Sequence, residues 1–415
     1  MEAYLALATL VVVLILVAWG RWRLELCALG GLFFLGVSGG APSSVLLSGF
    51  GHSALMTMAA VMVISQAIID SGLLKGLGLA LNRRLSSSRG QILGLSLLTA
   101  GISSLINNVG AVALMLPTGG RMARRLRLAP GAFGLPLALG AIIGGSMTLV
   151  GTGPNMLISG FRQAEMGSSF RMFDFLPVGL GMVLAASLAW VVCRSCGFLP
   201  GDQELPLEDV SSPPDAASQL PQSKRIITAV IAGVAVATVS AGWLPSDMGF
   251  GGAALLMIFS GVIRIESAYA SLDWPILLFI GAMLGISAAL TQSGALAPLD
   301  DWLASWVDGM PAIWIIAILF FASSILANST NNAAAAVTMA PVALMVAGQA
   351  GNVSVDALLM AVAVGSGLSI ILPTHQAALL ARRQLPFSLH TYARAGLLLT
   401  LLCGVVAVAL IRLIW

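Results

Sequence analysis

The sequence has few of the side chains that soluble proteins expose to water. Only 9% of its 415 residues are charged, and it contains just 3 tyrosines and 3 histidines. A water-soluble domain of this size needs many more charged groups on its surface, so the composition excludes a substantial soluble domain. Apolar residues are abundant: they make up 58% of the chain, and the mean hydropathy is +0.97. We predict an all-α integral membrane protein.

The residues that most catalytic sites need are also scarce. Only Cys193 and Cys196 of the 4 cysteines have a C-x-x-C spacing, and no further ligands near them complete a zinc site. A serine with a base, paired acids or metal ligands are missing from the apolar stretches, so we predict neither an intramembrane hydrolase nor any other enzyme. The charged rings and filter repeats of a passive channel are missing too. We expect no metal other than Na⁺ and no nucleic-acid partner.

Apolar segments of about 20 residues predict about ten spanning helices. The first is read as a retained span, because no basic region precedes it while Arg21 and Arg23 follow it. Two further apolar regions, 90–120 and 312–347, are interrupted by polar runs. The predicted spans are 2–19, 24–40, 52–71, 131–160, 175–193, 226–243, 250–263, 274–292, 355–381 and 395–412.

Basic residues decide the topology, because cytoplasmic loops hold most of the Lys and Arg. If 90–120 crossed the membrane once, the four arginines from Arg121 to Arg127 would lie outside. If it enters and returns as a re-entrant hairpin, all of the 20 basic residues except Arg162, Arg171 and Arg412 fall on the cytoplasmic side. Loops without a base flank 312–347, so this second hairpin is predicted to enter from the opposite side.

The two hairpins also match in sequence. Ser103–Pro117 reads SSLINNVGAVALMLP and Ala327–Pro341 reads ANSTNNAAAAVTMAP, which aligns the paired asparagines at an offset of 224. Opposed hairpins of matching sequence are typical of an inverted-repeat transporter. The predicted divisions are N-terminal spanning helices (1–45), a first repeat (46–196) with a cytoplasmic-side hairpin at about 90–126, a Pro-rich cytoplasmic linker (197–224), and a second repeat (225–415) with an outside-facing hairpin at about 312–347.

Each half contains a second polar break, at Gly151–Asn155 and at Pro373–Gln376. A broken helix in a membrane is tolerated only where protein buries it or where it lines a wet cavity, so each break should meet a hairpin tip near the midplane. Asn amides and free helix N–H groups suit an anion, and opened carbonyls suit Na⁺. The predicted substrate ligands are Asn107, Asn108, Thr152, Asn331, Asn332 and Thr374; the predicted cation ligands are Asn108, Gly151, Asn155, Asn332, His375 and Gln376.

Structural interpretations of the same residues stay open at this point. Paired asparagines also serve as hydrogen-bonding contacts between helices. Thr152 and Asn155, beside two glycines and a proline, also fit a simple kink. His375 fits a hydrogen bond to a neighbouring carbonyl or a role in proton coupling.

At these residues the sequence resembles the divalent anion:sodium symporter family of the ion transporter superfamily, and most closely its sulfate-permease-like branch. The likeness rests on Asn107-Asn108-Val109, Asn331-Asn332-Ala333, Gly151–Asn155, His375–Ala378 and Phe173–Gly179, and it covers roughly residues 50 to 400. It implies two bound sodium ions, an anion between the tips, a homodimer in the bacterial inner membrane, and elevator-type movement.

The chain departs from that family pattern at three positions. Val109 and Ala333 replace the tip threonines, and Ala378 replaces an asparagine of the second break, which weakens the expected second cation site. The leading functional prediction is Na⁺-coupled secondary active transport of a small anion such as a dicarboxylate, citrate or sulfate. The alternatives are proton-coupled anion transport and export of arsenite or another oxyanion.

Overall fold

A computed structural model describes residues 2–19, 21–74, 87–195, 221–294 and 306–415. Within these residues all regular secondary structure is helical, which confirms the predicted all-α fold. Cys196 and most of the predicted linker at 197–224 lie outside the described residues.

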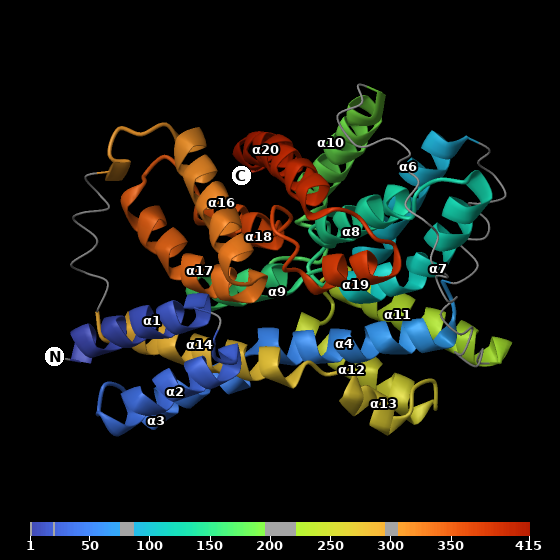
Figure 1. Cartoon of the computed structure of the whole chain (residues 1–415). Helices are drawn as coiled ribbons and strands as arrows, with labels where there is room; N and C mark the ends of the chain where they lie inside the picture. Colours follow the sequence, from blue (N-terminus) through green and yellow to red (C-terminus); the bar gives the residue numbers. More distant parts are fainter. Residues whose placement is uncertain (1, 20, 75–86, 196–220, 295–305) are drawn as a thin grey trace.

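The helices follow the same order in the two halves of the chain (Figure 1). The first half contains α1 (Glu2–Trp19), α2 (Leu24–Val37), α3 (Ser43–Leu47), a 3₁₀ turn η1 (Ser48–Gly51), α4 (Ser53–Ser71), α6 (Ser88–Ser103), α7 (Asn108–Leu126), α8 (Gly131–Gly145), α9 (Gly153–Met166) and α10 (Leu176–Ser195). The second contains α11 (Gln222–Ser240), α12 (Ser246–Phe259), α13 (Ile265–Ala270), α14 (Trp274–Gln292), α16 (Ala312–Ser329), α17 (Asn332–Gln349), α18 (Val355–Gly367), α19 (Gln376–Gln384) and α20 (Leu389–Ile414).

The contacts between helices also repeat in the two halves of the chain. The contact of α6 with α8 has its counterpart in α16 with α18, that of α7 with α8 in α17 with α18, and that of α9 with α18 in α19 with α8. The pair α1–α2 likewise corresponds to α11–α12. Because α1 to α3 have counterparts in α11 to α13, we propose that the repeat spans the whole chain instead of beginning at residue 46.

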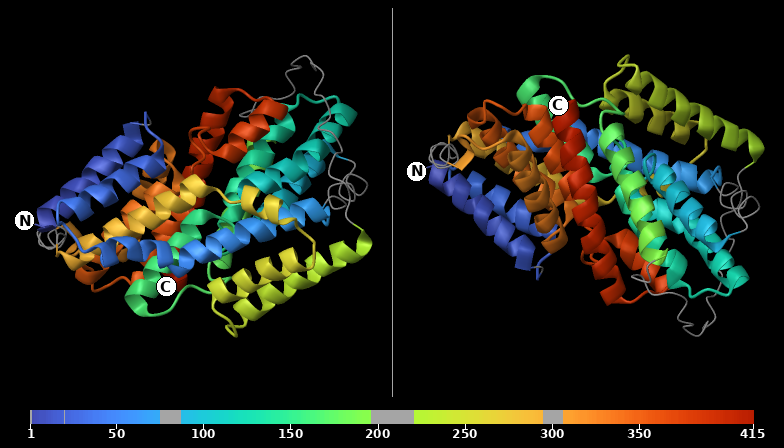
Figure 2. Two further views of the ribbon diagram at one scale, coloured as in Figure 1. Left: turned by 90° about the horizontal axis from the view of Figure 1, so that it is seen from below. Right: turned by 90° about the horizontal axis from the view of Figure 1, so that it is seen from above.

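The helices form two layers (Figures 1 and 2). One layer holds α1 to α4 with α11 to α14, and the other holds the hairpins, the broken helices, α10 and α20. The halves exchange partners within the first layer, because α2 packs on α14 while α12 packs on α4. They exchange again in the second, where α9 contacts the second hairpin through α17 and α19 contacts the first through α7.

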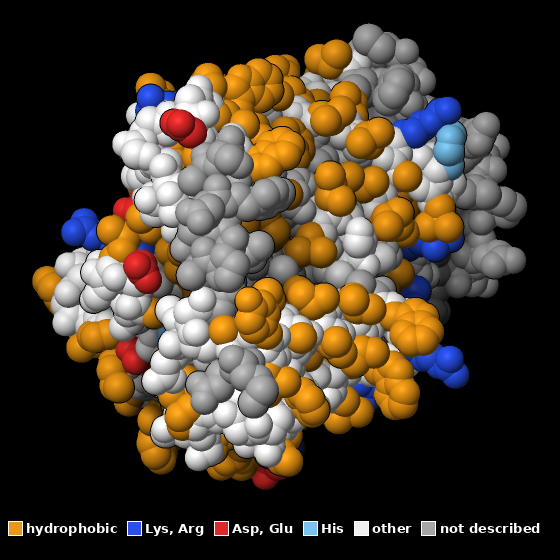
Figure 3. All heavy atoms as spheres, turned by 90° about the vertical axis from the view of Figure 1, so that its left-hand side faces the viewer, with side chains coloured by type: hydrophobic (Ala, Val, Ile, Leu, Met, Phe, Trp, Pro, Cys, Tyr) orange, Lys and Arg blue, Asp and Glu red, His pale blue; other side chains and the backbone are white. Residues whose placement is uncertain are grey.

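The surface is that of a protein surrounded by lipid. Large apolar side chains such as Val37, Trp243 and Phe259 are more than three-quarters exposed, and in the face shown in Figure 3 hydrophobic side chains cover much of the surface between a few charged ones. Six helices among the described residues are long and apolar enough to cross a bilayer, and several shorter apolar helices accompany them. A soluble protein would not leave this much apolar surface exposed.

The two interrupted regions form helical hairpins, α6 with α7 and α16 with α17, close to the predicted bounds. The long apolar segments 131–160 and 355–381 are each divided in two. Both break earlier than predicted, because α8 already ends at Gly145, before the expected break at Gly151, and α18 ends at Gly367, before the expected break at Pro373. The contacts that end α18 early belong to the site described next.

Candidate functional site

Each hairpin tip is built around an asparagine that caps the returning helix. The Asn107 side-chain oxygen accepts a hydrogen bond from the Gly110 N–H at 2.7 Å, and that of Asn331 accepts one from the Ala334 N–H at 2.8 Å. This capping satisfies backbone donors that would otherwise be unpaired at a helix start. The first asparagine of each pair therefore uses one lone pair of its oxygen within its own helix.

The second asparagine of the first tip connects the two halves of the chain. Asn108 is buried, its side-chain oxygen lies 2.8 Å from the Ser103 hydroxyl, and its amide nitrogen lies 3.3 Å from Nε2 of His375. His375 in turn caps α19, because its Nδ1 accepts the Ala377 N–H at 3.1 Å. The first hairpin tip is thus bonded to the break of the other half.

The His375 cap determines which way the Asn108 amide points. A neutral imidazole carries one proton, and Nδ1 acts as an acceptor here, so the proton lies on Nε2. The Asn108 group facing Nε2 must then be its oxygen, with the NH₂ turned to the Ser103 hydroxyl, since the two ends of an amide are assigned from their partners. Asn108 consequently presents its oxygen to His375 instead of to a cation in this conformation.

The first break is held by side chains of the site itself. The Thr148 hydroxyl donates to the Ser104 carbonyl at the first tip, and the Asn155 amide donates to the Thr148 carbonyl at 2.8 Å. Asn155 is fully buried, and its side-chain oxygen has no hydrogen-bond partner. An unsatisfied buried carbonyl oxygen is costly, and it is the type of atom that a hard cation binds.

Glycines allow this break to pack against the first tip. A Cβ atom on Gly145 would collide with the Asn108 side chain and lie 3.0 Å from the Gly151 carbonyl oxygen, while one on Gly151 would collide with the Gly145 carbonyl. Any larger residue at these positions would push the break away from Asn108.

The second break begins early because the first arm of its hairpin binds its backbone. The Ser324 hydroxyl and the Asn328 amide both donate to the Leu368 carbonyl, at 3.0 and 3.4 Å. The Asn328 oxygen accepts the N–H groups of Ile371 and Leu372, at 2.8 and 3.1 Å. Side chains thereby form hydrogen bonds with the backbone groups that a continued helix would have paired. The break in an apolar segment therefore leaves these groups satisfied.

The two breaks lie next to each other. A Cβ atom on Gly367 would lie 3.3 Å from the Ser146 hydroxyl and 3.7 Å from the Thr152 methyl group. The Asn332 amide lies 3.4 Å from the Gly367 carbonyl, so the second tip reaches the same place. Of the predicted ligands, Thr374 and Gln376 are exposed and take no part in these contacts.

Sequence reasoning missed several of the residues that hold the site together. They are Ser103, Thr148, Ser324 and Asn328, all of them buried. Ser103 and Asn328 stand in the aligned strings SSLINN and ANSTNN, where a second polar pair upstream of the asparagines was the available signal. Thr148 lies in the break between α8 and α9, and Ser324 lies in the apolar helix α16; both stand out only through their partners.

The tips and breaks contain no charged residue of their own. The segments 103–109, 145–155, 327–333 and 367–376 have no Lys, Arg, Asp or Glu. The helices α7, α9, α17 and α19 all begin at these tips and breaks, so their partially positive N-termini converge on the site. Helix dipoles and amides can therefore favour an anion there, and oxygens such as that of Asn155 can favour a cation beside it.

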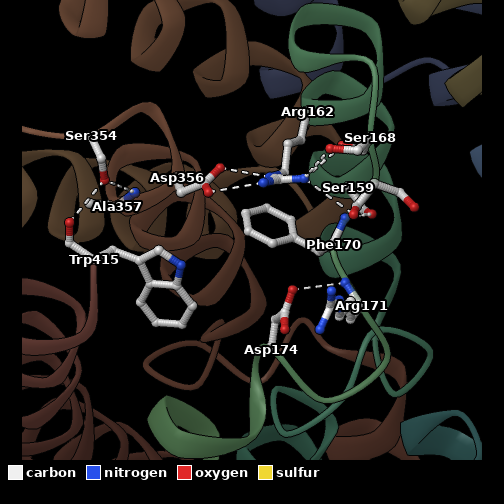
Figure 4. Close-up of polar contacts among 11 residues, drawn as sticks. Ser159, Arg162, Ser168, Phe170, Arg171, Asp174, Ser354, Asp356, Ala357 and Trp415 are labelled. Carbon is white, nitrogen blue, oxygen red and sulfur yellow. Dashed lines mark hydrogen bonds and ion pairs between the residues drawn. The ribbon is translucent and has the colours of Figure 1, made fainter. Parts of the chain in front are cut away.

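An ion pair fastens the broken helices of the two halves together at one end (Figure 4). Arg162 at the end of α9 donates to both carboxylate oxygens of Asp356 at the start of α18, at 2.7 and 3.0 Å. The guanidinium also donates to the Ser168 carbonyl and lies 4.8 Å from the centroid of the Phe170 ring. Two parallel hydrogen bonds give such a pair a fixed geometry, so it orients α9 against α18.

Comparison with known proteins identifies relatives of this chain. It is 29% identical over 206 residues to the uncharacterized transporter YfbS of Escherichia coli, which is 49% of this chain and 33% of that protein. It is 26% identical over 173 residues to the probable sodium/sulfate cotransporter 3 of Chlamydomonas reinhardtii, which is 39% of this chain and 19% of that protein. The chain thus spans a third or less of the length of these relatives.

The fold also resembles a solved structure. The YdaH transporter of Alcanivorax borkumensis superposes with a TM-score of 0.66 over 99% of this chain and 98% of that one, at 14% sequence identity. At this identity the likeness shows the fold alone.

The family model described as "Citrate transporter" matches residues 14–365, which is most of the chain. These matches agree with the resemblance to the anion symporters. The relatives are named as transporters, which agrees with the prediction that the protein is not an enzyme. The chain belongs to the citrate transporter family, and its described residues include several apolar helices long enough to cross a membrane.

Proposed function

We propose that this transporter carries a small anion by secondary active transport, coupled to Na⁺. The observation that supports the proposal is the buried Asn155 oxygen, which has no protein partner in an uncharged site where helix N-termini converge. A bound cation would satisfy that oxygen and add the positive charge that the site lacks for an anion. Citrate, a dicarboxylate and sulfate are the proposed substrates, the last in line with the name of the algal relative.

We further propose an elevator-type motion, in which the layer that holds hairpins and broken helices moves against the other layer. The support is that both tips and both breaks belong to one layer, so the whole site would move as a unit. By the resemblance to the symporters, the proposed setting is a homodimer in a bacterial inner membrane.

Proton coupling is the second candidate, because His375 contacts the first tip and Ala378 replaces the asparagine expected at the second cation site. One feature opposes it. A second ring proton would go to Nδ1, which accepts the Ala377 N–H, so protonation would cost α19 its cap. Export of arsenite or another oxyanion is the third, and the tips that lack hydroxyls at Val109 and Ala333 are compatible with it.

Flux measurements separate these candidates. Purified protein in proteoliposomes would be given radiolabelled citrate, succinate, sulfate and arsenite under an inward Na⁺ gradient, an inward proton gradient, or neither. We expect Na⁺-driven accumulation of one of the first three anions. Asn155→Ala should abolish it, while Asn352→Ala, a change at an exposed asparagine, should not. Accumulation under the proton gradient alone, or transport of arsenite only, would refute the proposal.

A further inference from the structure

The helices α1 and α2 lie at the edge of the molecule, away from the tips and breaks (Figure 2). An apolar groove lies between them. It encloses about 730 Å³ and is lined by twelve residues, among them Leu5, Val12 and Leu16 of α1 and Leu26, Gly30 and Phe34 of α2. The Thr9 hydroxyl, which also lines it, donates within its own helix to the Leu5 carbonyl at 2.8 Å. The groove therefore offers almost only apolar atoms to an occupant.

The groove runs along most of α1. From Leu5 to Leu16 the helix rises roughly 16 Å at 1.5 Å per residue, and Trp22 continues the lining beyond the end of α1. The hydrocarbon core of a membrane is roughly 30 Å thick. A lipid acyl chain that enters at the Trp22 end would therefore meet apolar wall over at least the depth of one leaflet.

The turn that joins α1 to α2 places an aromatic ring and positive charge at one end of the groove. Trp22 lines the groove and is 60% exposed, as expected for a side chain at the level of lipid headgroups. Arg23 is paired with the buried Glu25, at 2.5 Å. Arg21 is exposed and forms no ion pair with another described residue, so its guanidinium can reach a lipid phosphate.

The second half of the chain provides a comparison. The corresponding turn at 241–245 between α11 and α12 contains the exposed Trp243 but no Lys or Arg. The repeated packing of the two helix pairs therefore does not require a basic residue at this turn. Arg21 and Arg23 also lie on the side that the distribution of basic residues indicates to be cytoplasmic, where membranes carry negative surface charge.

From these features we infer that the groove binds one anionic glycerophospholipid, with an acyl chain between α1 and α2 and its phosphate at Arg21. The apolar walls account for the acyl chain, and the exposed guanidinium of Arg21 accounts for the preference for a negative headgroup. The inference is independent of the solute that the protein carries.

Native mass spectrometry of the purified protein tests the inference, with phosphatidylglycerol and phosphatidylcholine of the same acyl chains as probes. Gly30→Leu fills the groove, and it should fold because a Cβ atom at Gly30 has no neighbour within 4 Å. Gly252→Leu is the matched control, since Gly252 holds the equivalent place on α12 and is equally open. Arg21→Gln removes the charge, and Arg89→Gln is its control at another exposed arginine.

We expect the unaltered protein and both controls to retain one phosphatidylglycerol in preference to phosphatidylcholine. Arg21→Gln should reduce this preference by about fivefold, the effect of one basic residue near a charged membrane surface. Gly30→Leu should lose both lipids at this site. Unchanged phosphatidylglycerol binding in both variants would overturn the inference. So would a Gly30→Leu protein that keeps its lipid but changes from dimer to monomer, because the groove would then be an interface between copies.

Discussion

Asn108 in the first half of the chain and His375 in the second lie 3.3 Å apart, and the bond between them joins a hairpin tip to the break of the other half. His375 has two separable tasks, since Nδ1 caps α19 and Nε2 reaches Asn108. A site built in this way cannot rearrange in one half without affecting the other. Removing this bond therefore tests whether the two halves act together.

Replacing His375 separates its two tasks. His375→Asn should preserve the cap, because asparagine is a favourable capping residue, but its shorter side chain should not reach Asn108. We expect this variant to retain its thermal stability and lose most gradient-driven flux. His375→Ala should lose the flux and about 1 kcal/mol of stability as well. Flux in proteoliposomes and unfolding in detergent are the two measurements, and normal flux in His375→Asn would show that the bond to Asn108 is dispensable.

The second break lacks the oxygen that the first break presents. Ala378 is fully buried at the position that corresponds to Asn155. If Asn155 contributes the essential cation ligand, the rate of transport should rise with Na⁺ concentration without cooperativity. Initial rates across a Na⁺ titration measure this directly. A sigmoidal dependence would mean that a second Na⁺ binds despite Ala378.

Close packing at the first break should not tolerate a methyl group. Gly145→Ala would push a Cβ atom into the Asn108 side chain, and overpacking of this kind typically costs about 1–3 kcal/mol. We expect lower thermal stability and loss of flux together. Gly101→Ala on α6 is the matched control, because its added Cβ meets nothing within 4 Å. Equal behaviour of the two variants would argue that the break can move away from Asn108 freely.

The Arg162–Asp356 ion pair should contribute to stability. Both side chains are about four-fifths buried, so removing one partner leaves the other with an unpaired charge. Arg162→Gln should cost about 2 kcal/mol, the scale of a hydrogen bond to a charged group. Arg171→Gln, at an exposed arginine nearby, should cost much less. Thermal unfolding of both variants checks the difference, and an Arg162→Met, Asp356→Leu double variant should recover part of the loss.

Local sequence was enough to locate the hairpins, the paired asparagines and most helix ends. Polar runs are conspicuous in an apolar chain, and loops that carry basic residues restrict how the segments can be threaded. The early ends of α8 at Gly145 and of α18 at Gly367 were not predictable in this way. Leu368 to Leu372 is an apolar stretch, and it leaves the helix because Ser324 and Asn328, more than 40 residues away, bind its backbone.

The contact between Asn108 and His375 was missed for a related reason. Repeat matching paired each tip with the break of its own half, and the structure contains those contacts, but it also brings α19 of the second half against α7 of the first. Sequence similarity between the halves indicates that they share a fold. It does not indicate whether an element packs on its own half or on the other half, because the local sequence and the apolar patterning are the same in both cases.

That exchange has a consequence for how the chain is made. α4 packs on α12, and α2 packs on α14, so α4 does not find its main partner until residues up to 259 have been synthesised, and α2 does not find its own until residues up to 292 have been. Until the later helices are inserted, the apolar faces of the early helices contact lipid. Assembly of this protein is therefore a joint event near the end of translation, and the first half released by itself would lack the surfaces that complete it.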